Sequence, residues 1–265
     1  MSTVTSADGT TLGFDRLGDG PPVVLVGGAF QYRAFDPRTG QLADLLASRY
    51  TVVHYDRRGR GESGDTPPYA VEREVEDLAA LIGAVGGSAA LFGMSSGAAL
   101  ALDAVAAGLP VTRLAVYEAP FAVDGSRPPQ PAGYVARLSE LVAEGRRGDA
   151  VEYFLTAGAG VPAEVVGQMR HAPMWPGFEA VAHTLPYDAA LMDGTVTGGP
   201  LPADRWAGVT VPVLVGDGGA SPKSMASAAE ALAELLPDTR RITFPGQDHA
   251  IAPEVLAPAL VDFYG

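Results

Sequence analysis

The sequence predicts an α/β fold, a doubly wound and mostly parallel sheet with a helical cap inserted between two late core strands. Short unbroken apolar runs alternate with segments of helical spacing in residues 1–120, and again in residues 209–265. Such runs are typical of parallel strands that helices cover on both faces. Residues 121–208 have helical spacing but no convincing strand. We therefore assign 1–120 and 209–265 to one core and 121–208 to a cap.

The core elements follow one another in a regular order. The expected strands are VVLV at 23–26, YTVVHYD at 50–56, AALFG at 89–93, RLAVYEAP at 113–120, VPVLVGD at 211–217 and RRITF at 240–244. The expected core helices lie around 42–46, 71–82, 96–107, 225–236 and 253–264. This alternation predicts parallel strands joined by helical crossovers.

The cap is predicted to be helical throughout. Residues 135–142 and 178–185 keep one apolar helical face each. Asp149 and Glu152 have the spacing of a capping box, and Pro162 stands where a helix can start. Proline- and glycine-rich segments at 124–133 and 197–206 bound this region.

Composition excludes several classes of protein. The 265-residue chain is 47% apolar and 18% charged, which is globular composition. Its net charge of −13 argues against a nucleic-acid partner and against docking on anionic membranes. There is no cysteine, and the four histidines are widely spaced, so we expect no metal and no cofactor. The sequence has neither a signal-peptide pattern nor a membrane-spanning apolar run, so we expect a cytoplasmic protein, and the oligomeric state stays open.

The segment Gly93-Met94-Ser95-Ser96-Gly97 matches the pattern G-x-S-x-G. An apolar strand enters it and a helix of small residues leaves it, which is the setting of a nucleophile elbow. Ser95 is the candidate nucleophile. Ser96 opens the helix, and its backbone N–H is a candidate oxyanion donor. The alternative is a glycine-rich turn whose serine caps the helix.

With this motif the chain resembles the α/β-hydrolase family with a helical cap, over nearly its whole length. VVLVGGAF is similar to the strand and oxyanion loop of the family, which usually ends His-Gly-x. Gly27 stands at the His position and Gly28 at the Gly position, and the resemblance implies that the Ala29 N–H is the second oxyanion donor. Residues 55–64, YDRRGRGESG, resemble the D-x-R-G-x-G-x-S loop, which is structural in most members.

His249 is the candidate base. A serine hydroxyl is a poor nucleophile unless a base takes its proton. The segment FPGQDHAIAPEVL places His249 after the last strand and before the last helix. The histidine of the resembled family occupies the same G-x-x-H setting, here Gly246 to His249.

Two carboxylates compete for the role of the acid behind His249. In most of the family the acid follows the strand after the cap, but Ala220 and Ser221 fall at that position, and Asp217 comes earlier, at the end of the strand. Some members carry the acid one strand earlier, directly after the strand that follows the elbow helix; here that strand is RLAVYEAP, and its end presents Glu118. We predict that Glu118 is the acid, with Asp217 as the alternative.

These residues predict a serine hydrolase that acts on an ester-like bond (ester, lactone or thioester) through an acyl-enzyme. The small-molecule substrate is expected to be largely apolar. The candidate pocket residues are Phe30, Met94, Phe121, Phe154, Met174, Trp175, Phe178, Tyr187 and Met192. Cleavage of a carbon–carbon bond stays open. So does a different class of protein, a non-hydrolytic enzyme such as a cyclase or a small-ligand receptor that reuses the fold.

Overall fold

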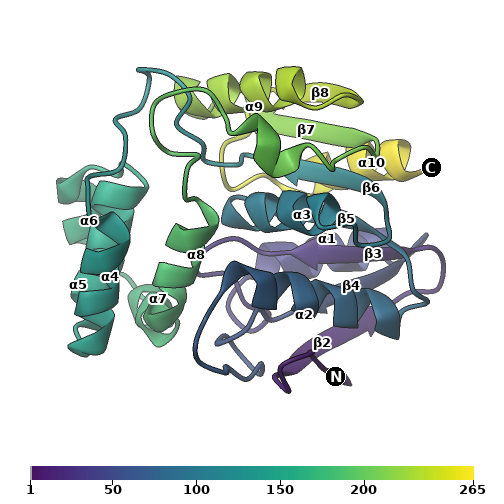
Figure 1. The fold of residues 1–265 in the computed structure, drawn as a ribbon, viewed down its shortest axis with the longest axis horizontal. Helices are drawn as coiled ribbons and strands as arrows, with labels where there is room; N and C mark the ends of the chain where they lie inside the picture. Colours follow the sequence, from purple (N-terminus) through teal and green to yellow (C-terminus); the bar gives the residue numbers. More distant parts are fainter. Residues whose placement is uncertain (1) are drawn as a thin grey trace.

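The computed structural model describes residues 2–265 (Figure 1). Within them one sheet has eight strands in the spatial order β1-β2-β4-β3-β5-β6-β7-β8. The strands are β1 (Ser2–Thr5), β2 (Thr11–Leu17), β3 (Pro22–Val26), β4 (Thr51–Tyr55), β5 (Ala89–Met94), β6 (Val111–Tyr117), β7 (Val213–Gly218) and β8 (Thr239–Phe244). Strand β2 is antiparallel to β1 and β4, and all pairs from β4 to β8 are parallel. The carboxyl ends of the parallel strands therefore meet at one edge of the sheet.

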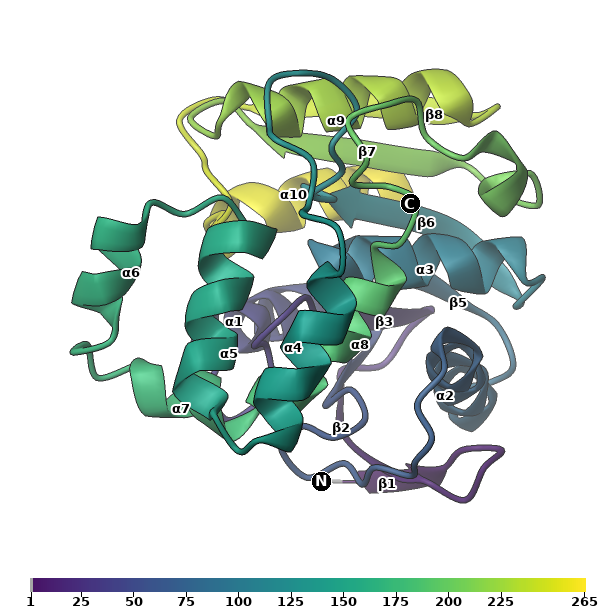
Figure 2. The same ribbon diagram turned by 60° about the vertical axis from the view of Figure 1, so that its left-hand side comes forward.

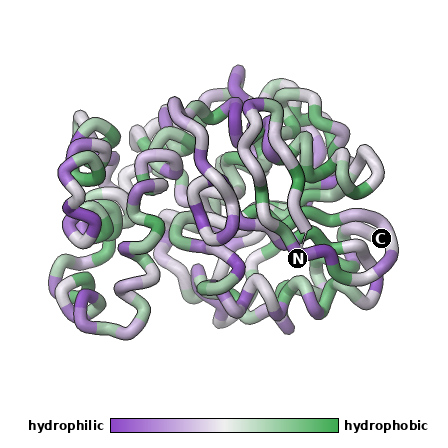
Figure 3. Tube along the Cα trace, turned by 90° about the horizontal axis from the view of Figure 1, so that it is seen from below, coloured by the Kyte–Doolittle hydropathy of each residue, from purple (hydrophilic) through white to green (hydrophobic). Residues whose placement is uncertain are grey.

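Helices cover both faces of the sheet. The first face carries α2 (Val71–Ala84), α3 (Ser96–Ala106) and α9 (Lys223–Leu235), and the second carries α1 (Pro37–Leu46) and α10 (Pro253–Tyr264). Alternate strand residues serve the two faces, so Leu91 belongs to the first apolar cluster and Phe92 to the second. Figure 3 shows the hydrophobic parts of the trace concentrated inside and the hydrophilic parts at the periphery.

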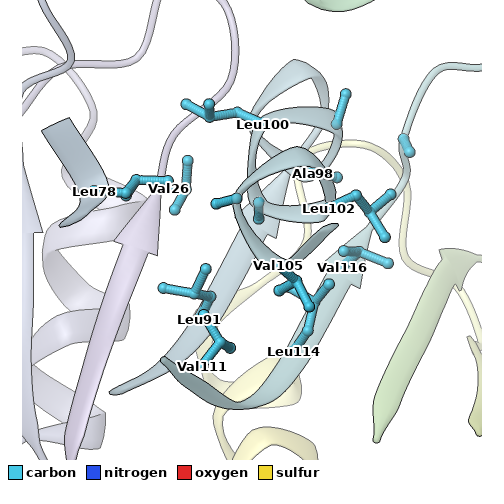
Figure 4. Close-up of a cluster of buried hydrophobic side chains, with 14 of the residues drawn as sticks. Val26, Leu78, Leu91, Ala98, Leu100, Leu102, Val105, Val111, Leu114 and Val116 are labelled. Carbon is cyan, nitrogen blue, oxygen red and sulfur yellow. The ribbon is translucent and has the colours of Figure 1, made fainter. Parts of the chain in front are cut away.

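Helix α3 lies deep in the first face. Its side chains Leu100, Leu102 and Val105 pack in one cluster with Leu91 of β5 and Val116 of β6 (Figure 4). This helix is buried on nearly all sides, and its residues are mostly small or apolar, apart from Asp103, which pairs with Arg205. This packing fixes the helix N-terminus at the carboxyl edge of the sheet.

A group of helices lies between β6 and β7 in the sequence and stands to one side of the sheet (Figure 2). It contains α4 (Tyr134–Ala143), α5 (Arg147–Tyr153), a π-helical turn (Phe154–Gly158), α6 (Ala163–Met169), α7 (Trp175–Ala180), a 3₁₀ turn (Ala182–Thr184) and α8 (Leu185–Leu191). A second 3₁₀ turn (Ala203–Trp206) precedes β7 and lies against α3. Buried apolar residues between 134 and 189 form a cluster of their own together with Phe30. Those between 191 and 209 pack in the cluster under α3, so this stretch adheres to the core.

Two features of the chain differ from the sequence-based expectation. The six expected strands are present as β3 to β8, but the β1–β2 pair was not expected. Helix α5 starts at Arg147, so Asp149 lies inside its first turn and pairs with Arg146 and Arg170. The predicted capping box is therefore wrong. In the part of the chain that the structure describes, no helix is both long and apolar enough to cross a bilayer.

Candidate active site

Ser95 occupies the turn between β5 and α3. Its φ of 56° and ψ of −128° lie in a region that L-residues rarely adopt. A Cβ on Gly93 would lie 2.7 Å from Ala98 Cα, and one on Gly97 would lie 2.4 Å from the Val26 carbonyl oxygen. Glycine at both positions is what lets the strand, the turn and the helix approach this closely. The turn presents Ser95 at the wall of a cavity.

The loop after β3 runs directly against the Ser95 turn. A Cβ on Gly28 would lie 2.7 Å from Ser95 Cβ. Ala29, the next residue, lines the same cavity as Ser95. No hydrogen-bond acceptor for the Ala29 N–H is found within residues 2–265. Ser96 is the first residue of α3, where a backbone N–H has no partner inside the helix. Both predicted oxyanion donors thus lie beside Ser95.

His249 lines this cavity too, and Glu118 holds its ring. The distance between His249 Nδ1 and Glu118 Oε2 is 2.8 Å. Glu118 directly follows β6, and its side chain is 0% exposed whereas that of His249 is 46% exposed. The other carboxylate oxygen, Oε1, accepts the Gly218 N–H at 2.9 Å. A carboxylate at Nδ1 favours the tautomer with the proton there, which leaves Nε2 free to accept a proton.

Glu118 is ionised at neutral pH. Burial by itself would raise the pKa of this carboxyl group, but its hydrogen bonds with His249 and with the Gly218 N–H outweigh burial. Together they hold the pKa of Glu118 below its usual value. The group can therefore stabilise a positive charge on His249.

Asp217 faces away from this pair. The Thr243 hydroxyl donates to both of its carboxylate oxygens, at 3.0 and 3.1 Å, and Arg241 Nε lies 3.3 Å from Oδ1. Both partners belong to β8, so the carboxylate is engaged along the sheet. Of the two candidate acids, Glu118 is the one in contact with His249.

The cavity beside Ser95 has a volume of about 560 Å³. It runs from Ser95 between α1 and α10 and under α7. Its apolar walls are Phe30, Phe35, Leu42, Phe92, Met94, Met174, Phe178, Ile251 and Leu256. Of the candidate pocket residues, Phe30, Met94, Met174 and Phe178 therefore line it.

The other candidate pocket residues lie outside this cavity, and four of them are held by neighbours of their own. Phe121 packs against Trp206 in the core, with ring centroids 5.2 Å apart. Phe154 stands behind Phe30 and meets it edge to face.

Two cap aromatics are held by polar or stacking partners instead. Trp175 is buried and donates its Nε1–H to Glu179 at 2.9 Å. Tyr187 stacks on Tyr69 with centroids 3.8 Å apart. None of these four aromatics lines the cavity: Phe154 and Trp175 pack in the apolar cluster of residues 134–189, Phe121 packs in the core, and Tyr187 lies on Tyr69.

One wall of the cavity is polar, which the sequence reasoning did not anticipate. Gln31 Oε1 accepts the Gly28 N–H, and Gln31 Nε2 donates to Asp36 Oδ2, both at 2.5 Å. Asp36 also caps α1 through the backbone N–H groups of Arg38 and Thr39. The sequence signal for the cap is Asp36 before a proline, whereas nothing in the sequence marks Gln31 as a brace for the oxyanion loop.

The remaining histidines lie outside this cavity. His54 is buried in β4, and burial lowers its pKa. His183 lies in the 3₁₀ turn Ala182–Thr184, and His171 is exposed. Within the described residues, no three or more His, Cys, Asp or Glu side chains are grouped to hold a metal ion.

Comparison with known proteins identifies the family. A sequence model of the alpha/beta hydrolase family matches residues 23–261. The chain belongs to the alpha/beta hydrolase family. Its fold is similar to the crystal structure of an alpha/beta hydrolase from Sphaerobacter thermophilus DSM 20745, with 59% sequence identity over 100% of both chains and a TM-score of 0.92. The predicted family and fold are therefore confirmed.

Two other hydrolases are similar at lower identity. The structure of the esterase RhEst1 from Rhodococcus sp. ECU1013 has a TM-score of 0.69 and 23% identity over 99% of this chain and 97% of that one, which shows a shared fold. The uncharacterized hydrolase YraK of Bacillus subtilis (strain 168) is 36% identical over 100 residues. That match covers 36% of this chain and 35% of YraK, so the chain spans about a third of the length of this curated relative.

Proposed function

We propose that this alpha/beta hydrolase is a serine hydrolase that cleaves an ester-like bond (ester, lactone or thioester) of a small, largely apolar molecule. One observation carries the proposal: Ser95, in a strained turn, and His249, held by the buried Glu118, line one apolar cavity. The nucleophile, the base and a substrate-sized space thus occur together.

In the proposed reaction His249 Nε2 takes the proton of Ser95 Oγ as that oxygen bonds to the substrate carbonyl carbon. The carbonyl oxygen becomes an oxyanion between the N–H groups of Ala29 and Ser96. When the tetrahedral intermediate collapses, the bond to the alcohol or thiol breaks, and the leaving group takes the proton from His249.

Water then completes the cycle. His249 removes a proton from the water molecule as the water oxygen bonds to the acyl carbon. When the second tetrahedral intermediate collapses, the bond between Ser95 Oγ and the acyl carbon breaks, the acid is released, and His249 returns its proton to Ser95 Oγ. Glu118 remains ionised throughout and stabilises the imidazolium that forms in each half.

The walls of the cavity support the substrate class. Its side chains near Ser95 are mainly aromatic and aliphatic. Among the polar lining residues, Gln31, Asp36 and Thr39 hydrogen-bond to one another or to the backbone, and Arg38 is exposed to solvent. A neutral apolar acyl or alcohol group suits such walls.

Two measurements test the proposal. The wild type is expected to hydrolyse p-nitrophenyl esters and to be labelled by a fluorophosphonate at the Ser95 peptide, as read by mass spectrometry. Ser95→Ala should remove the label and lower kcat by about 10⁵–10⁶-fold. A wild type without label and without turnover would overturn the proposal and would favour a non-hydrolytic use of the pocket.

A further inference from the structure

Four fully buried charged side chains meet between the core and the cap. Arg57 forms two hydrogen bonds of 2.7 Å to Glu74 and one of 2.7 Å to Asp188. Arg60 donates to the other oxygen of Asp188 at 2.6 Å. We call these four residues the ionic cluster. Their side chains are 0–2% exposed.

The cluster joins three separate parts of the chain. Arg57 and Arg60 belong to the loop after β4, Glu74 belongs to α2, and Asp188 belongs to the cap helix α8. Burial alone would raise the pKa of Asp188, but the two guanidinium groups outweigh it and hold the pKa below its usual value. Asp188 is therefore a charged residue that the cap inserts into the core.

The arginines of the cluster also bind the oxyanion loop. Arg60 Nη1 donates to the Gly28 carbonyl oxygen at 2.5 Å, and Arg57 Nη1 donates to that of Gly27 at 3.3 Å. The Gly28 carbonyl and the Ala29 N–H belong to one planar trans peptide unit, in which the two bonds point in opposite directions. Fixing the carbonyl on Arg60 therefore fixes the direction of the Ala29 N–H.

Asp188 reaches the second oxyanion donor as well. Its Oδ1 accepts the Ser96 hydroxyl at 2.7 Å, and both groups are buried. The preceding carbonyl, that of Ser95, accepts the Ala98 N–H at 3.0 Å. Ser96 is thus fixed twice, by the hydrogen bond of its side chain to Asp188 and by the hydrogen bond to the carbonyl of the peptide unit that contains its N–H.

We propose that Asp188 is a positioning residue: through Arg60 and Ser96 it fixes the two backbone donors of the oxyanion hole, so that the cap completes the catalytic site of the core. This inference rests on the proposed function. Asp188 touches no reacting atom. Its loss would leave the Arg60 charge buried with one anchor fewer and would loosen the hold of Arg60 on the Gly28 carbonyl, whose other donor, the Gln31 N–H, lies 3.4 Å away.

The test compares two variants in which a buried aspartate is replaced by the neutral asparagine. Both aspartates pair with arginines of the loop after β4. Asp188→Asn breaks the contact that leads to the oxyanion hole. Asp77→Asn is the matched control, because Asp77 binds Arg58 at 2.7 and 2.8 Å and is equally buried. The other partners of Arg58 are Asp8 and the Arg73 carbonyl, which lie outside the oxyanion loop.

For Asp188→Asn we expect kcat for a p-nitrophenyl ester to fall about 10- to 100-fold. The two N–H donors would still be present but displaced, so they would lose much of the oxyanion stabilisation that is lost when a donor is removed. KM should change less than about threefold, because the cavity walls are intact. The affinity for an alkylboronic acid, which mimics the tetrahedral oxyanion, should fall by the same factor as kcat/KM. Asp77→Asn should lower the thermal midpoint and leave kcat within about threefold.

Full kcat in Asp188→Asn, or an equal loss of kcat in Asp77→Asn, would overturn the inference while leaving the proposed function intact. If the wild type is labelled by fluorophosphonate but turns over no ester, the labelling rate at Ser95 replaces kcat in the same comparison. A wild type with neither property overturns both proposals. If Asp188→Asn does not fold, Arg60→Lys takes its place, because one ammonium group cannot span Asp188 and the Gly28 carbonyl as the guanidinium does. Wild-type kcat in Arg60→Lys would equally reject the role.

Discussion

Replacing Glu118 by Gln tests the proposed acid, and the structure dictates how the new amide must sit. Glu118 Oε1 accepts the Gly218 N–H and Oε2 faces His249 Nδ1. The amide oxygen of Gln will keep the bond to Gly218, because otherwise two donors would meet there. Its NH₂ group then points at Nδ1, which must become the acceptor, so the imidazole proton moves to Nε2.

An imidazole with its proton on Nε2 cannot take the proton of Ser95. The wrong tautomer in a comparable triad lowers kcat by about 10⁴-fold, so we expect a loss of about 10³–10⁴-fold for Glu118→Gln. This factor corresponds to about 4–5.5 kcal/mol of transition-state stabilisation. The measurement is kcat for a p-nitrophenyl ester at neutral pH, together with a thermal melt that shows the variant is folded.

Asp217→Asn is the paired control. Asp217 is as buried as Glu118, but its partners are Thr243 and Arg241. It should lose about 1–3 kcal/mol of stability and keep kcat within about threefold. Full activity in Glu118→Gln together with a large loss in Asp217→Asn would refute the reasoning and make Asp217 the acid.

Three further outcomes follow from the geometry. Gly97→Ala puts a Cβ 2.4 Å from the Val26 carbonyl oxygen and should strongly lower the free energy of unfolding measured by denaturant titration. Gly83→Ala, in helix α2 with open space around the new Cβ, should raise the same free energy by up to about 1 kcal/mol. Leu42→Ala enlarges the cavity and should shift the kcat/KM profile for p-nitrophenyl esters toward longer acyl chains. Leu46 is buried in the same helix but does not line the cavity, so Leu46→Ala should lower stability and leave that profile unchanged. Because the pKa of Asp188 is lowered in the folded state, its ionised carboxylate stabilises the fold above about pH 4, and this stabilisation is lost as the pH falls through the folded-state pKa. The difference in unfolding free energy between wild type and Asp188→Asn should therefore be constant from about pH 5 to 8 and shrink below about pH 4.

Sequence reasoning reaches the elements whose signal is local. The nucleophile elbow was predictable because its strained turn requires glycine on both sides of Ser95, and both glycines lie within the five consecutive residues 93–97. Glu118 could be proposed because some members of the resembled family carry the acid after this strand, and because the carboxyl ends of neighbouring parallel strands meet at one edge of the sheet. The β1–β2 pair was missed because STVT and TLGFDRL have short, half-exposed strand patterns without a long apolar run.

Other features depend on which surfaces meet, and no local pattern encodes them. Several aromatics of the cap looked like pocket walls, but a cap of short helices must bury aromatic side chains within itself. Phe154 and Trp175 are accordingly part of its own apolar cluster. The sequence of the helix that contains Asp188 has no pattern that marks this residue, and its partners Arg57 and Arg60 are more than 120 residues away in sequence. Such pairings become visible only when the cap is placed on the core.

The ionic cluster also explains why the cap boundary near α8 is polar. Four buried charges are costly to desolvate, and apolar residues of similar volume often give equal or greater stability. An apolar boundary, however, has no directional contacts and cannot turn a peptide plane. Arg60 can, because its planar fork holds Asp188 with one nitrogen and the Gly28 carbonyl with another. On this argument the cluster exchanges stability for orientation, so apolar replacements of all four residues should give a chain that still folds but stabilises an oxyanion poorly.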